Sequence, residues 1–146
     1  MIRPIQDLDL TDIQNKLIHV FNWPTANAEL CCEQYKNYLL LQKKYGHEIP
    51  LPPSQCIDEA WHLHILDTRK YKKDCEDFLG RFLDHDPYYP KVDTGSPDIA
   101  GDTLKYVDMF ERTQELYFQE FGSHIKEARP KVRDGLLKSF WKFLIN

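Results

Sequence analysis

The segment from Asp58 to His85 carries the residue types that could do chemistry. It holds three of the six histidines and one of the four cysteines of the chain, together with several carboxylates. Imidazole, thiolate and carboxylate groups bind transition metals and transfer protons. The segment therefore predicts a metal site or an acid–base site, and it does not by itself indicate a substrate.

Helix geometry divides the two neighbouring histidines of this segment. Asp58 and His62 are four residues apart, so they lie on the same face of a helix. His62 and His64 are two residues apart and are separated by about 200° around the helix axis. An apolar stripe through Trp61 is flanked by His62 on the side of Asp58. We therefore expect His62 to face the site, oriented by Asp58, and His64 to point outward.

A tetrahedral zinc site can be assembled from the reactive residues of this segment. We expect His62, Cys75 and His85 to be ligands, with Asp58 or water as the fourth group. The mixed nitrogen and sulfur donors would also suit iron or nickel. His64 is the candidate proton carrier. The spacing is not that of a zinc finger, and neither Cys-x-x-Cys nor His-Glu-x-x-His is present.

Two other interpretations of the same residues stay open. In the first, His62 and Asp58 form a buried hydrogen-bond network and Cys75 is a small core residue, so that the cluster is a structural polar core. In the second, Cys75 is a thiol nucleophile with His62 or His85 as its base, although no flanking oxyanion motif is present.

The sequence predicts that the elements that position these residues are helices. Apolar residues recur at helical spacing, which predicts one compact all-α domain over residues 1–146 with about five or six helices. One long loop containing proline and glycine, over residues 81–101, interrupts them. We expect helices to begin at Thr11, which acts as a capping residue, at Thr25, after the N-cap Ser54, near Asp67–Thr68, at Asp102 or Thr103, and near Asp134. Three of these helices are expected to end at Gly46, Gly80 and Gly122.

Composition narrows the class of protein. With 42% hydrophobic residues the chain can form a core, and a formal net charge of -4 disfavours nucleic-acid binding. The N-terminus lacks the apolar run of a signal peptide, and no segment is long and apolar enough for a membrane span. We expect a soluble cytoplasmic protein with reduced thiols, while export by a specialised secretion machine stays open.

The segment from Asp58 to His85 also resembles the glycine-rich-domain-containing-protein-like family, a set of domains of unknown function. Ile65 stands where that family usually has methionine, and the glycine-rich tail of its larger members is absent, which is typical of a minimal bacterial-type member. The resemblance implies that the matching residues form one constellation, and it implies no established reaction. These residues are Asp58, Trp61, His62, His64, Tyr71, Cys75, Gly80 and His85.

Two functional hypotheses follow. The first is a helical protein with a mononuclear zinc site, for which metal-assisted hydrolysis is the least committed reaction. The second is a non-enzymatic interaction module, in which the cluster is structural and a protein partner binds the aromatic loop over residues 82–90.

Overall fold

The computed structural model describes residues 1–86 and 99–131 of the chain, and within these ranges it contains helices and no strands. The predicted all-α fold is thereby confirmed. The elements are the 3-10 turn η1 (Ile5–Asp7), the helices α1 (Thr11–His19), α2 (Thr25–Tyr45), α3 (Gln55–Leu66) and α4 (Thr68–Asp74), the π-helical turn η2 (Cys75–Leu79) and α5 (Ile99–Phe121). No helix in the described part of the chain is long and apolar enough to cross a membrane.

Of the two predicted capping residues, Ser54 is confirmed. Its side chain accepts a hydrogen bond from a backbone amide in the first turn of α3, and Asp67, which was not predicted as a cap, does the same for α4. The prediction that Thr11 caps α1 is wrong. Thr11 is already the first helical residue, and its N–H donates to Asp9 Oδ1 at 2.9 Å. The aspartate two residues upstream supplies the acceptor that the sequence analysis assigned to the threonine.

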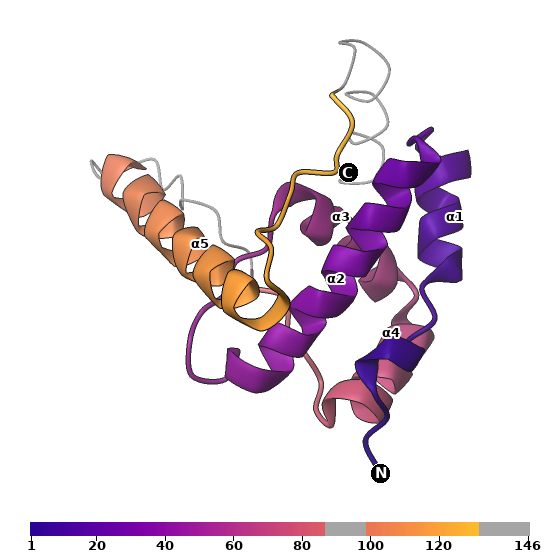
Figure 1. Ribbon diagram of the computed structural model, residues 1–146. Helices are drawn as coiled ribbons and strands as arrows, with labels where there is room; N and C mark the ends of the chain where they lie inside the picture. Colours follow the sequence, from indigo (N-terminus) through magenta and orange to yellow (C-terminus); the bar gives the residue numbers. More distant parts are fainter. Residues whose placement is uncertain (87–98, 132–146) are drawn as a thin grey trace.

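Helix α2 is the centre of the fold. In Figure 1 it runs diagonally through the molecule, and α1, α3 and α5 all pack against it. A helix covered on several sides needs apolar or hydrogen-bonded residues around most of its circumference, which explains why its sequence lacks one clear apolar stripe. Its buried residues are Ala28, Cys31, Cys32, Gln34, Tyr35, Tyr38, Leu39, Leu41 and Gln42.

The segment between Asp67 and Gly80 returns the chain toward α3. Helix α4 packs on α3 and continues into η2, which ends at Gly80 with φ of 75°. The predicted helix limits at Asp67–Thr68 and Gly80 are confirmed, whereas the π-helical turn was not predicted. A left-handed residue reverses the chain sharply, so residues 81–86 fold back toward α3 and carry His85 with them.

Two expectations about the second half of the chain need correction or lie outside the described residues. Helix α5 begins at Ile99, ahead of the predicted start at Asp102 or Thr103, and Gly101 lies inside it. One interior glycine costs a helix only about 1 kcal/mol and does not end it. The helix predicted near Asp134, and most of the loop over residues 81–101, lie outside the described residues.

After α5 the chain continues as an extended C-terminal arm, residues 123–131, that runs back over α2 (Figure 1). The side chain of Gln34 on α2 donates to the carbonyl of Lys126 at 2.8 Å and accepts from its N–H at 2.7 Å. The Gln114 side chain binds the backbone of Ile125 in the same two-sided way, at 3.0 and 2.8 Å. Buried amide side chains thus satisfy backbone groups that have no strand or helix partner.

Gly80 and Gly122 both have positive φ, but only Gly80 is crowded. A Cβ at Gly80 would lie 2.9 Å from Ile2 Cδ1, whereas nothing lies within 4 Å of one at Gly122. Alanine at either position costs about 1 kcal/mol for the left-handed conformation. We expect Gly80→Ala to lower the free energy of unfolding further, because Ile2 must also move. Urea denaturation of both variants measures this, and an equal loss would contradict it.

Candidate metal centre

The two histidines of α3 divide as the helix geometry requires, but in the opposite sense to the prediction. His64 is the buried one, with 2% of its surface exposed, whereas His62 is half-buried with 37% of its side chain exposed. The buried face of α3 includes Ala60 and His64 as well as Trp61. Ala60 is fully buried, and a stripe drawn through the large apolar residues does not take a small residue into account.

The predicted pairing of Asp58 with His62 is confirmed, and His85 joins them. The carboxylate of Asp58 lies between the two imidazoles: Oδ1 is 2.8 Å from His85 Nε2, and Oδ2 is 3.5 Å from His62 Nδ1. One ligand atom from each of the three residues lies within 4.8 Å of the others. Among the described residues this is the one group with the spacing of a metal site.

His62 presents an atom that suits a metal ligand. Its Nδ1 is buried and has no hydrogen-bond partner, since the contact with Asp58 is too long. Burial lowers the pKa of His62, against the opposing attraction of Asp58. The ring is therefore neutral at pH 7, which is the form that binds metals.

The position of His85 depends on two aromatic residues, Trp61 and Tyr71. The Trp61 ring packs against the His85 ring, with 4.4 Å between centroids. Trp61 Nε1 donates to the Tyr71 hydroxyl at 2.9 Å, and that hydroxyl donates to the carbonyl of Leu83 at 2.5 Å. Tyr71 therefore links α3 to the segment that carries His85, and holds this segment two residues before the histidine.

Cys75, the predicted sulfur ligand, lies outside the group formed by Asp58, His62 and His85. It is buried at the start of η2 beside the Tyr71 hydroxyl, and burial raises the pKa of its thiol. A raised pKa favours the neutral thiol over the thiolate that binds zinc or attacks a substrate. The role of Cys75 as a ligand stays a prediction.

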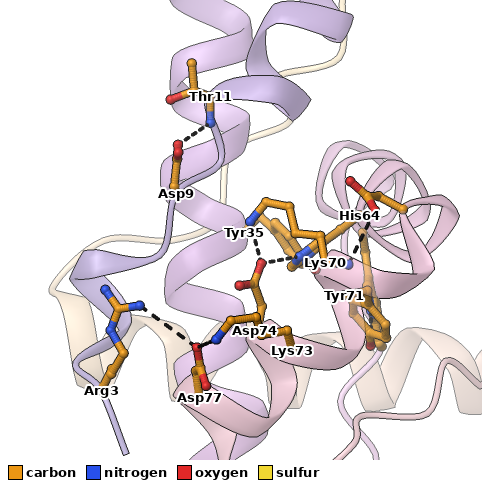
Figure 2. Close-up of polar contacts among 12 residues, drawn as sticks. Arg3, Asp9, Thr11, Tyr35, His64, Lys70, Tyr71, Lys73, Asp74 and Asp77 are labelled. Carbon is orange, nitrogen blue, oxygen red and sulfur yellow. Dashed lines mark hydrogen bonds and ion pairs between the residues drawn. The ribbon is translucent and has the colours of Figure 1, made fainter.

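His64, the candidate proton carrier, belongs to a second network in the core (Figure 2). Its Nδ1 is 2.9 Å from the Tyr35 hydroxyl and its Nε2 is 2.9 Å from Asp74 Oδ2. Lys70 also binds Asp74. Both ring nitrogens are occupied, which explains how a polar ring can be buried between α2, α3 and α4. Its environment is that of a structural polar core. Such a core was predicted around His62, and the structure has it around His64.

Sequence reasoning missed several partners because they are distant along the chain. Tyr35 is 29 residues from His64, and its type and spacing gave no sign of this contact. Glu59 was also missed: its carboxylate is 2.9 Å from Arg129 Nε in the C-terminal arm, and burial raises its pKa to about 7. Asp74 was missed as well, although it lies next to Cys75 in the chain.

Removing the Asp74 carboxylate tests the buried network. Asp74→Ala leaves a buried histidine N–H without an acceptor, which we expect to lower the free energy of unfolding by about 2 kcal/mol. Asp77→Ala is the matched control, because Asp77 pairs with Lys73 at the same helical spacing and with Arg3, and both cations are more than half exposed. We expect a much smaller change there. Equal urea midpoints for the two variants would contradict a structural role for Asp74.

Comparison with known proteins gives one match. A family model described as UCP032817-like matches residues 10–97, which is more than half of the chain and includes the whole of the candidate centre. No curated protein and no solved structure is significantly similar to the chain.

Proposed function

This chain belongs to the UCP032817-like family, and we propose that it binds a single Zn²⁺ ion through Asp58, His62 and His85. The family is uncharacterised, so the proposal depends on the geometry of these three residues. The observation that carries it is His62 Nδ1, a buried nitrogen that has no hydrogen-bond partner and lies beside a carboxylate and a second imidazole. Buried polar atoms are nearly always paired, and a bound cation would satisfy this one.

The donor types fit zinc. Two imidazoles and one carboxylate are the ligands of many catalytic zinc sites, which keep a fourth position for water or substrate. Ligand atoms around a tetrahedral zinc are about 3.4 Å apart, and the three ligand atoms here lie within 4.8 Å of one another. Three protein ligands leave the fourth position of the ion to water or substrate. Cys75 lies outside this group of residues.

An open fourth position supports hydrolysis as the reaction class. Zinc lowers the pKa of a bound water to about 7 and so supplies hydroxide at neutral pH. In this arrangement Asp58 and the two histidines hold the ion. The Trp61 ring excludes water from one side of His85. His64 is buried apart from this group, so the proposal gives it no part in proton transfer.

We also propose a relationship with the glycine-rich-domain-containing-protein-like family, on the resemblance of the segment from Asp58 to His85. Within the motif, each conspicuous residue has a distinct place in this fold. Asp58, His62 and His85 form the candidate centre, Trp61 and Tyr71 hold it, and Gly80 makes the turn that returns the chain to it.

A second candidate function is the non-enzymatic interaction module. One observation favours it: Asp58 and His85 are already paired by a 2.8 Å hydrogen bond, which stabilises the fold without a metal. Phe82, at the start of the aromatic loop, is 53% exposed while its ring packs edge-on against Tyr71. Residues 87–90 of that loop lie outside the described residues.

Metal analysis of the untagged protein separates the two functions. We expect close to one zinc per chain, and in calorimetric titrations a loss of affinity of about 100-fold or more in His62→Ala and His85→Ala. His19→Ala is the matched control, because His19 is exposed at the end of α1. Protein that is stable in chelator and does not take up zinc would refute the metal site. A loss in Cys75→Ser as large as that in His62→Ala would establish Cys75 as a ligand.

Tyr71 offers a test of how the centre is positioned. Tyr71→Phe removes the hydrogen bond to Leu83 and frees the segment that carries His85, so we expect zinc affinity to fall by about 10-fold. The visible absorption of bound Co²⁺ should change as well, which a purely global destabilisation would not cause. Tyr117→Phe is the control, because it loses one buried contact, with Asn37, on another side of α2. Unchanged Co²⁺ spectra in Tyr71→Phe would refute this role.

A further inference from the structure

Two cysteines that show no pairing pattern in the sequence meet in the core. Cys31 on α2 and Cys56 on α3 both have 0% of their surface exposed. Cys31 Sγ donates to the backbone carbonyl of Cys56 at 2.9 Å. The two thiols are therefore neighbours across the contact between α2 and α3.

The surroundings of the Cys56 sulfur are polar although it is buried. Gln34 Nε2 donates to it at 3.6 Å, and Ser54 Oγ lies 3.4 Å away, where either atom can be the donor. Cys56 also lies in the first turn of α3, where backbone N–H groups have no helical partners. Such donors stabilise negative charge on sulfur, and this is the environment in which cysteines react as thiolates. Cys31 then stands in the place of a resolving thiol.

We propose that Cys31 and Cys56 are a redox-active pair that forms a reversible disulfide between α2 and α3 when the protein meets a hydroperoxide. The Cys56 thiolate attacks the terminal peroxide oxygen and the O–O bond breaks, which gives a sulfenic acid on Cys56. The leaving hydroxide or alkoxide takes up the proton that the Cys56 thiol released on ionisation, and departs as water or an alcohol. Cys31 then attacks the Cys56 sulfur, and hydroxide leaves and takes up the proton of the Cys31 thiol as water. Two thiols are thus oxidised by two electrons and one peroxide is reduced.

The pair is covered by the C-terminal arm. The carbonyl of Lys126 lies 3.8 Å from Cys56 Sγ, and Gln34 binds the arm and the sulfur with the same amide group. Asn27 holds the next part of the arm through the carbonyl of Ala128 at 2.9 Å. The arm also buries Ile125 and Ala128 in the core, so we infer that it opens as a unit while α2 and α3 stay folded. This opening gives the oxidant access.

Oxidation of the folded protein with hydrogen peroxide tests the proposal. We expect the intact mass to fall by about 2 Da, reversibly with dithiothreitol. Nonreducing tryptic maps should join the peptide over residues 17–36 to that over residues 45–69. Cys31 and Cys32 share the first peptide, so variants must separate them. The link should form in Cys32→Ser and fail in Cys31→Ser, and in Cys31→Ser dimedone should trap a sulfenic acid on Cys56.

The double variant Cys32→Ser, Cys75→Ser keeps only the proposed pair, and it does not depend on the stability of Cys31→Ser. After treatment with peroxide and then unfolding, it should show no free thiol. Two free thiols in that variant, or a link in the wild type that uses Cys32, would overturn the proposal. Asn27→Ala, which removes one bond to the arm, should speed oxidation, and an unchanged rate would overturn the arm as the cover.

Discussion

The hydrogen bond from the Trp61 indole to the Tyr71 hydroxyl is the interaction on which the rest of the site depends. It joins α3 to α4 in the core, and the same hydroxyl donates a hydrogen bond to the carbonyl of Leu83. The segment after Gly80 is thereby fixed against α3, and His85 comes to rest between the Trp61 ring and Asp58. A buried indole N–H requires a partner, so packing of the tryptophan and placement of the histidine are not independent.

Helix α3 carries two groups of polar residues on different sides, and their hydrogen bonding differs. The side of α3 that faces α2 and α4 carries His64, whose nitrogens are both satisfied by Tyr35 and Asp74. The side that borders solvent carries Asp58 and His62, where one nitrogen is left without a partner. A fully paired histidine contributes to stability, and an unpaired one is available to a ligand. The difference lies in hydrogen-bond satisfaction, and residue type alone does not reveal it.

The contact between α2 and α3 brings two cysteine thiols together. Cys31 and Cys56 meet where the helices pack closely, and the C-terminal arm lies over them through the amide of Gln34. The arm is also joined to α3 by the ion pair of Arg129 with Glu59. Helix α3 therefore supplies residues to the candidate metal centre, to the structural network and to the thiol pair, on different sides of its circumference.

The sequence by itself determined the helices, most of their limits and the pairing of Asp58 with His62, because these depend on periodicity, capping and four-residue spacing within one element. It also identified His85 as a member of the centre. Only the tertiary structure decided that His64 is buried and His62 half-exposed, that Cys75 lies outside the centre, and that Cys31 meets Cys56. These outcomes depend on which side of α3 packs closest to α2. The inner side carries Ala60, which is fully buried, and the position of a small residue in the core cannot be read from the spacing of large apolar residues.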